Sequence, residues 1–298
     1  MNSIRSNIQQ LRKQILDKAI RGELVPQDPN DESALLLIQR LQQEKEYLIK
    51  LRKIKKEKNI VSIDYSNVPF RIPDSWIWTN LGSIGEIIGG GTPSTTNENN
   101  FSMEGIPWLT PADLSGYREK KISKGARDIS EKGLNSSSAQ IMPEGTVLFS
   151  SRAPIGYVAI AANPISTNQG FKSIVPFLRE EYLCEYIYYF LLASREEIAN
   201  KAPGTTFKEV SGGIVKKILI PLPPKQEQER IVKKVDALMK LCDDLEEKAV
   251  EVDKFISLLQ DKVFQSAVEG KLVEQDPNDE PASILIERIQ NDNAYFVL

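Results

Sequence analysis

The two ends of the chain carry the same sequence. Residues 11–42 read LRKQILDKAIRGELVPQDPNDESALLLIQRLQ, and residues 259–290 read LQDKVFQSAVEGKLVEQDPNDEPASILIERIQ. The two segments are identical at 16 of 32 positions at a constant offset of 248 residues, and the block QDPNDE recurs unbroken. Because one copy comes before and one after a long central region, the repeat predicts two equivalent units that flank a domain, and it excludes a solenoid of stacked repeats.

Each copy has the pattern of a helix, a break and a second helix. In the first copy, Leu11 and Ile15 have helical spacing, Gly22 is a C-terminal stop, and the run Asp31-Glu32-Ser33 supplies an N-cap for the next apolar run. Two interpretations are open: a small helical packing unit, or a surface needed twice, for two identical partners or a pseudo-symmetric assembly. The polar loop is kept more faithfully than the helices, and packing alone preserves apolar spacing only, so the second interpretation is favoured.

The region after residue 224 has a heptad pattern of apolar residues. Two sets of residues seven apart form an a/d seam over about five heptads: Val235, Cys242, Ala249, Ile256 and Val263, with Ile231, Leu238, Leu245, Val252 and Leu259. A helix of about 40 residues is about 60 Å long, too long for a small globular core. It is expected to pair with another long helix, in this chain or in a second copy, with Cys242 as a small packed residue.

The central region has the composition and the apolar pattern of a mixed α/β domain. It is rich in Gly, Pro, Ser, Thr and Asn, and short apolar runs at 84–88, 145–149, 157–160 and 173–175 predict strands bounded by turns. Residues 181–199 predict an apolar helix, and residues 216–224 a last strand with a rigid exit. The expected fold class is α+β, with helical arms at 1–60, a domain at 61–224 and the long helix with the second repeat copy at 225–298.

Composition excludes several kinds of chemistry. The 298 residues include no histidine, which removes histidine-based nucleophile pairs and His-ligated zinc, and the two cysteines are too few for a thiolate zinc site. The net charge of −3 gives no global basic field, so any nucleic-acid binding must come from local patches. No apolar run approaches the roughly 18 residues that span a bilayer, and the N-terminus lacks a signal-peptide layout, so a cytoplasmic protein with no membrane contact is expected.

Six motifs in order resemble the specificity subunits of type I restriction–modification systems, in a short form with one target recognition domain. They are VPFRIPDSW at 68–76, GGGTPS at 89–94, SRAPIG at 151–156, TNQGF at 167–171, IPLPPKQEQERIV at 220–232, and the repeated QDPNDE. The resemblance covers essentially the whole chain. It implies a non-catalytic subunit without its own cofactor or metal, whose recognition domain reads double-stranded DNA. Its implied partners are methylation subunits, which carry S-adenosylmethionine and modify adenine, and a motor–nuclease restriction subunit.

The presence of one recognition domain departs from the usual two. The resemblance then implies a homodimer that pairs through the long helix and reads a two-part inverted repeat. An alternative is a chain derived from a two-domain parent by gene splitting or truncation. Two rival classes, a stand-alone enzyme and a coiled-coil DNA-binding regulator or scaffold not tied to methylation, lack supporting motifs or leave the repeated loops unexplained.

Candidate DNA contacts are polar, basic or glycine-rich, because phosphates supply affinity and base edges supply specificity. They are Gly91, Thr92, Ser94 and Thr95 in the glycine-rich loop; Tyr117, Arg118, Lys120, Lys121, Lys124 and Arg127 in the basic stretch 117–127; and Arg152, Lys172, Lys201, Thr205, Thr206 and Lys208. The basic stretch holds five positive residues and one negative. Asn168 and Gln169 have side chains that can read adenine, but family members with different targets share this stretch, which favours a scaffold role.

Overall fold

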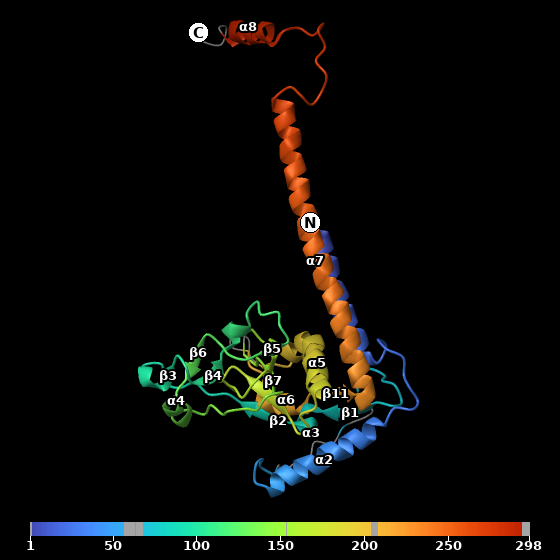
Figure 1. Cartoon of the computed structure of the whole chain (residues 1–298), viewed down its shortest axis with the longest axis vertical. Helices are drawn as coiled ribbons and strands as arrows, with labels where there is room; N and C mark the ends of the chain where they lie inside the picture. The colour runs from blue at the N-terminus through green and yellow to red at the C-terminus, as the bar shows by residue number, and fades with distance from the viewer. Residues whose placement is uncertain (1, 57–62, 64–67, 153, 204–207, 294–298) are drawn as a thin grey trace. The chain divides into compact units, whose positions relative to one another are not determined.

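The computed structural model describes residues 2–56, 63, 68–152, 154–203 and 208–293. The chain divides into two compact units, Gln9–Cys242 and the pair of segments Met1–Ile8 and Asp243–Leu298, which are described separately. The larger unit contains the whole central domain (Figure 1). The predicted α+β class is confirmed, with several short sheets followed by one very long helix.

The first repeat copy forms the predicted helix–break–helix. Helix α1 spans Asn2–Arg21 and ends at Gly22, whose φ of 74° lies in the left-handed region that favours glycine. Helix α2 spans Ala34–Lys50, and the Ser33 side chain accepts a hydrogen bond from the Leu35 N–H as its N-cap. Ala34, Leu37 and Leu41 form the buried face of α2.

The central domain is closed by pairing of its first and last strands. Strand β1 (Ile77–Asn80) pairs antiparallel with β11 (Leu219–Leu222), with Trp78 opposite Pro221. The short helices α3 (Leu81–Ile84) and α6 (Gly212–Lys217) pack together beside this pair. The sequence predicts the last strand from residue 216. Residues 216 and 217 instead belong to α6, a helix that begins after Ser211, whose side chain accepts a hydrogen bond from the Ile214 N–H as an N-cap.

A five-stranded mixed sheet forms the centre of the domain, in the order β2–β10–β7–β8–β5. Its strands are β2 (Gly85–Gly89), β10 (Lys172–Pro176), β7 (Val147–Phe149), β8 (Val158–Ala161) and β5 (Lys121–Ile122). Helix α5 (Glu181–Asn200) packs against β7 and β8. Leu148, Ala159 and Phe171 are fully buried in the core cluster under this sheet.

A four-stranded sheet forms the end of the domain far from the start of the long helix (Figure 1). Its order is β3–β6–β4–β9, from Phe101–Ser102, Arg127–Ile129, Ile106–Leu109 and Ser166–Thr167, and β4 and β9 run parallel. Helix α4 (Glu131–Asn135) and the turns η2 (Glu98–Asn100) and η3 (Pro111–Leu114) complete this end. Trp108 and Ile129 are buried in its own small core.

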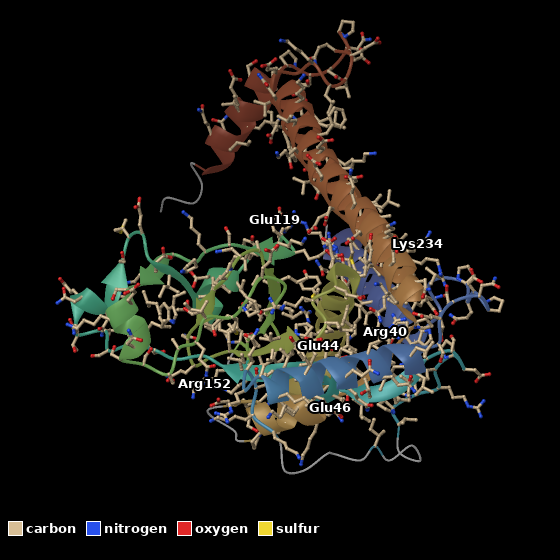
Figure 2. All side chains as sticks on the ribbon, turned by 60° about the horizontal axis from the view of Figure 1, so that its bottom comes forward. Arg40, Glu44, Glu46, Glu119, Arg152 and Lys234 are labelled. Carbon is tan, nitrogen blue, oxygen red and sulfur yellow. The ribbon has the colours of Figure 1, made fainter. Side chains whose placement is uncertain are left out.

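Helix α7 spans Lys225–Val268, 44 residues. Its first part, within the larger unit, lies beside residues 9–21 of α1, which run in the opposite direction (Figures 1 and 2). Ile231, Val235 and Cys242 of the heptad seam are buried there, and Leu238 is half-buried. In the smaller unit, the seam residues Leu245, Val252, Ile256, Leu259 and Val263 are exposed and Ala249 is half-buried. The unit ends with helix α8, Ala282–Asn293.

Candidate nucleic-acid interface

A surface cleft of about 520 Å³ lies where three loops of the central domain meet. Its lining comes from the turn after β4, from the segment after β7 and from the loop between β9 and β10: Thr110, Pro111, Ala112, Ser115, Arg152, Pro154, Tyr157, Asn168, Gln169 and Gly170. Two of the sequence motifs, SRAPIG and TNQGF, therefore meet at one site although they lie apart in the chain.

Backbone-directed hydrogen bonds fix the walls of the cleft. Asn168 Oδ1 accepts from the Gly170 N–H at 2.8 Å, which holds the turn and leaves Gln169 exposed at the rim. Thr110 and Asp113 form a capping box, in which the Thr110 hydroxyl and N–H both donate to Asp113 Oδ2 at 2.7 Å. Asn168 therefore has a structural role, and Gln169 is the amide that faces solvent.

Two predicted cations meet at the mouth of this cleft around one carboxylate. Arg152 Nε lies 2.8 Å from Glu209 Oε2, and Lys172 Nζ lies 3.2 Å from Glu209 Oε1. Burial acts to raise the pKa of Glu209, but the hydrogen bonds from Arg152 and Lys172 outweigh it and lower the pKa. Glu209 is therefore ionised at neutral pH and holds both cations. The exposed Lys208 precedes Glu209 in the chain.

The glycine-rich loop packs against the same region. The Gly91 N–H donates to the Thr167 oxygen at 2.9 Å, and the Gly91 oxygen accepts from Trp108 Nε1 at 3.0 Å. A Cβ at Gly90 would lie 2.0 Å from the Asn168 oxygen. These glycines are needed for close backbone packing, and the Gly91 N–H is already used inside the domain. Thr92, Ser94 and Thr95 are exposed beyond it.

The basic stretch 117–127 contacts one wall of the cleft, where the Ala126 N–H donates to Asp113 Oδ1 at 2.8 Å, but two of its lysines have acidic partners within the protein. Glu119, in this stretch, and Arg152 lie toward opposite edges of the central domain in Figure 2. Lys120 Nζ lies 3.0 Å from Glu185 Oε2 and 2.8 Å from Asp236 Oδ1. Lys121 Nζ lies 2.7 Å from Glu181 Oε1. The geometry gives these two lysines a structural role that competes with phosphate contact.

The other predicted contacts are dispersed. The Tyr117 hydroxyl donates to the Lys121 oxygen at 2.6 Å, and the Arg127 guanidinium lies 3.4 Å from the centre of the Phe101 ring. Lys201 pairs with Glu197 on α5 at 2.7 Å. Arg118 and Lys124 are exposed. Thr205 and Thr206 lie outside the described residues.

Sequence reasoning missed Tyr157 and Thr110, which line the cleft, and Glu209, which binds Arg152 and Lys172. Arg152 and Glu209 face each other in an isolated antiparallel bridge, a pairing between residues 57 positions apart that no local pattern reveals. Tyr157 is the first residue of the predicted strand 157–160, and the observed strand begins one residue later, at Val158. Within the described residues, no group of His, Cys, Asp and Glu side chains is arranged to hold a metal ion, and no helix is long and apolar enough to cross a bilayer.

A family profile decides the classification of the chain. Residues 73–252 match the type I restriction modification DNA specificity domain. The chain belongs to this family. The match begins just before β1 and ends within α7, so it includes the cleft, the basic stretch and the first part of the long helix.

Curated relatives are specificity subunits of type I restriction enzymes. The chain is 38% identical to the MjaIX specificity subunit of Methanocaldococcus jannaschii over 66% of its own length and 44% of that protein. It is 31% identical to the EcoAI specificity subunit of Escherichia coli over 97% of its length and 56% of that protein. A solved structure from a study of assembly of the type I restriction–modification system matches 90% of this chain and 58% of that chain, at 20% identity and a TM-score of 0.55. The chain thus spans about half the length of these relatives.

Proposed function

We propose that this chain is a DNA-recognition subunit of a type I restriction–modification complex. It has no catalytic role of its own; it brings DNA to methylation subunits that carry S-adenosylmethionine, and to a motor–nuclease subunit. The family match over residues 73–252 and the specificity-subunit relatives support this assignment.

The cleft at Arg152 is the proposed DNA contact. It combines cations that suit phosphate, Arg152 and Lys172, with an exposed amide at Gln169 that has the donor and acceptor needed at a base edge. Lys208 and the exposed Thr92, Ser94 and Thr95 extend the polar surface around it. The single observation that carries this choice is the balance of charge. Arg152 and Lys172 share one carboxylate, Glu209, whereas Lys120 and Lys121 face three carboxylates, on α5 and α7.

The chain is further proposed to act as a homodimer that reads an inverted repeat. One chain carries one recognition domain and a long helix whose second half exposes an apolar seam. Two-fold pairing through this seam places two identical domains on one DNA, with half-sites about one helical turn, or about 34 Å, apart. A homodimer cannot read two different half-sites, because its symmetry makes them equivalent.

The test is methylome sequencing of cells that express this chain with a cognate methylation subunit. The expected result is adenine methylation at an inverted repeat with an unspecified spacer, which disappears when this chain is left out. Arg152→Ala should reduce methylation at every target. Arg40→Ala, which removes the same charge from α2 where Arg40 pairs with Glu32, should leave it unchanged. Methylation independent of this chain, or turnover by the purified chain alone, would contradict the assignment.

A further inference from the structure

Within the larger unit, two polar pairs join the first repeat copy to the start of α7. The Arg230 guanidinium binds the Asp31 carboxylate through both oxygens, at 3.0 and 2.5 Å. Gln27 Nε2 donates to Glu227 Oε1 at 2.7 Å, and Gln27 Oε1 accepts from the Ser75 hydroxyl at 3.1 Å. We call the receiving surface, made of Glu227, Arg230 and residues 73–76, the socket.

An apolar face docks together with these polar pairs. Ile15 and Ala19 of α1 and Leu37 and Leu41 of α2 are each at most 6% exposed. The break between the helices fits closely as well, because a Cβ at Gly22 would lie 2.5 Å from the Pro73 ring. Docking of the first copy therefore depends on a small set of buried apolar positions and on the polar loop.

The second copy keeps the internal structure of this module. Gln27 Nε2 donates to the Gly22 oxygen at 3.2 Å, and the equivalent Gln275 donates to the Gly270 oxygen at 3.0 Å. Further equivalent hydrogen bonds recur within the two copies: Asn30 to Asp28 and Asn278 to Asp276, each at 2.9 Å from the backbone N–H, and Arg40 to Glu32 and Arg288 to Glu280, each at 2.5 Å. The loop is thus pre-formed in both copies.

The docking positions of the second copy are identical or conservatively replaced, and they are exposed. At the offset of 248, Gln27 and Asp31 become Gln275 and Asp279, and the buried positions Ile15, Ala19, Ala34, Leu37 and Leu41 become Val263, Ala267, Ala282, Leu285 and Ile289. All seven residues of the second copy are exposed.

Two charge reversals between the copies lie on the rim of the docked module. Lys13 becomes Asp261, and Lys13 forms a surface pair with Glu196 in which both side chains are more than 60% exposed. Arg21, which lies over the Phe70 ring, becomes Glu269. Exposed ion pairs contribute little to stability, so these two reversals leave the docking face, whose buried positions all stay apolar, largely unaffected.

We propose that the second copy docks in the socket of a second copy of this chain, where it takes the place of that chain's own first copy. The inference rests on the homodimer of the proposed function and specifies how it is built. Asp279 pairs with the partner's Arg230, and Gln275 pairs with the partner's Glu227.

The energetics favour exchange over simple addition. At the socket, one copy replaces a closely similar one, so the free energy of burial there is nearly unchanged. The net gain comes from the part of α7 before the second copy, where Leu245 and Val252 are each at least half exposed in one chain and would be covered in the dimer.

The exchange also fixes the direction of the helices. Residues 11–20 of α1 run opposite to the first part of α7 (Figure 1), and residues 259–268 correspond to them in the repeat. Seated in the partner's socket, residues 259–268 run opposite to the partner's α7. The two long helices are then antiparallel, as a two-fold axis across them requires.

A charge-swap series in the full chain tests the exchange. The variant D31R/R230D reverses the pair within one chain and keeps it complementary, so the first copy remains docked. Its socket then carries a carboxylate at position 230, which repels an incoming Asp279, and the dimer dissociation constant from sedimentation equilibrium should rise about tenfold or more. Adding Asp279→Arg restores complementarity, and the triple variant should return to within about threefold of the wild type.

The matched control is Glu274→Arg. It makes the same charge change in the same loop, at the position equivalent to Pro26, and should leave dimerisation unchanged. If D31R/R230D, folded by circular dichroism, dimerises like the wild type, or if Asp279→Arg fails to rescue it, the exchange is wrong. A wild-type chain that stays monomeric also overturns it.

DNA recognition is measured separately, as sequence-specific methylation by the chain together with its cognate methylation subunit. Retained sequence-specific methylation together with a failed charge swap rejects the exchange and leaves the DNA-recognition role intact. If the wild-type chain and the methylation subunit together give no sequence-specific methylation, the proposed function itself is rejected.

Discussion

Lys120 Nζ lies 2.8 Å from Asp236 Oδ1, and this contact joins the recognition domain to the long helix. Lys120 precedes β5 at the sheet edge, and Asp236 is in the first third of α7. Glu185 of α5 binds the same ammonium at 3.0 Å, and the Tyr189 hydroxyl donates to Asp236. The direction in which α7 leaves the domain is therefore set by a connected polar cluster as well as by apolar packing.

Breaking this cluster should loosen the helix without abolishing the fold. Lys120→Met and Asp236→Asn should each reduce the free energy of unfolding, and the double variant should lose less than the sum, with a coupling energy of about 1 kcal/mol. Urea unfolding of the three variants and the wild type gives the cycle. Purely additive effects would show that Lys120 and Asp236 act independently and would return Lys120 to the candidate phosphate contacts.

Removing the negative charge at the mouth of the cleft should strengthen DNA binding. Glu209→Gln leaves Arg152 and Lys172 without their ionised partner, so a phosphate no longer competes with a carboxylate for them. Affinity for target DNA, measured with the methylation complex at low salt, should rise about three- to tenfold, with a log–log salt slope steeper by up to about 0.9 per added phosphate contact.

The control for that variant is Glu196→Gln, which makes the same charge change where Glu196 pairs with Lys13. It should leave both the affinity and the salt slope unchanged. Weaker or equal DNA binding by Glu209→Gln would mean that the Arg152 cleft does not face phosphate.

Equivalent positions of the two repeat copies should respond differently to the same kind of substitution. Leu41 is fully buried and Ile289 is 50% exposed. Leu41→Ala should destabilise the monomeric chain by about 3 kcal/mol through reduced burial and a residual cavity, whereas Ile289→Ala should change stability by less than about 0.5 kcal/mol. Thermal or urea unfolding at concentrations below dimer formation measures both, and equal losses would show that the second copy is also packed in one chain.

The Cys184 thiol should be inert in the folded protein. Burial raises its pKa to about 12, so at pH 8 only about one thiol in ten thousand is ionised. In a Cys242→Ser background, DTNB should react slowly with the native chain and at once after unfolding in guanidinium, and the native rate should increase with pH. Rapid labelling of the native chain at pH 8 would show that α5 opens readily.

Lengthening the long helix should move the two half-sites apart. Four residues inserted near Glu247 add about 6 Å at 1.5 Å per residue, which is one or two base pairs at about 3.4 Å each. The methylated sequence should keep its half-site letters and gain that much spacer. An active variant with an unchanged spacer, or a wild-type target without two-fold symmetry, would show that the helices do not set the distance.

Much of the fold follows from local pattern, and much of the candidate site does not. The heptads from Ile231 to Val263 and the apolar run 181–199 identified α7 and α5, and short apolar runs located β2, β7, β8 and β10. Strands such as β3, β5 and β9 have two residues each, too few to show any alternation, so they were missed.

The remaining differences between the predicted and the observed site come from residue pairs that are far apart in the sequence and adjacent in the fold. Lys120 and Asp236 are 116 residues apart, and Arg152 and Glu209 are 57 apart, so no spacing in the sequence relates them. The sequence identified the cations as candidates but could not separate those held by α5 and α7 from those at the cleft. Their roles as DNA contacts, and the pairing of the distal seam, stay predictions.

The antiparallel pairing of β1 with β11 has a consequence for how the central domain can be exchanged. Asn80 lies directly opposite Leu219, so the chain enters and leaves the recognition domain at points about 5 Å apart. The residues between Asn80 and Leu219 therefore form one segment whose two ends are adjacent. A domain with two adjacent ends can be grafted there while α1, α2 and α7 keep their sequence, so under the proposed function exchange of this one segment supplies a new specificity without redesign of the helices.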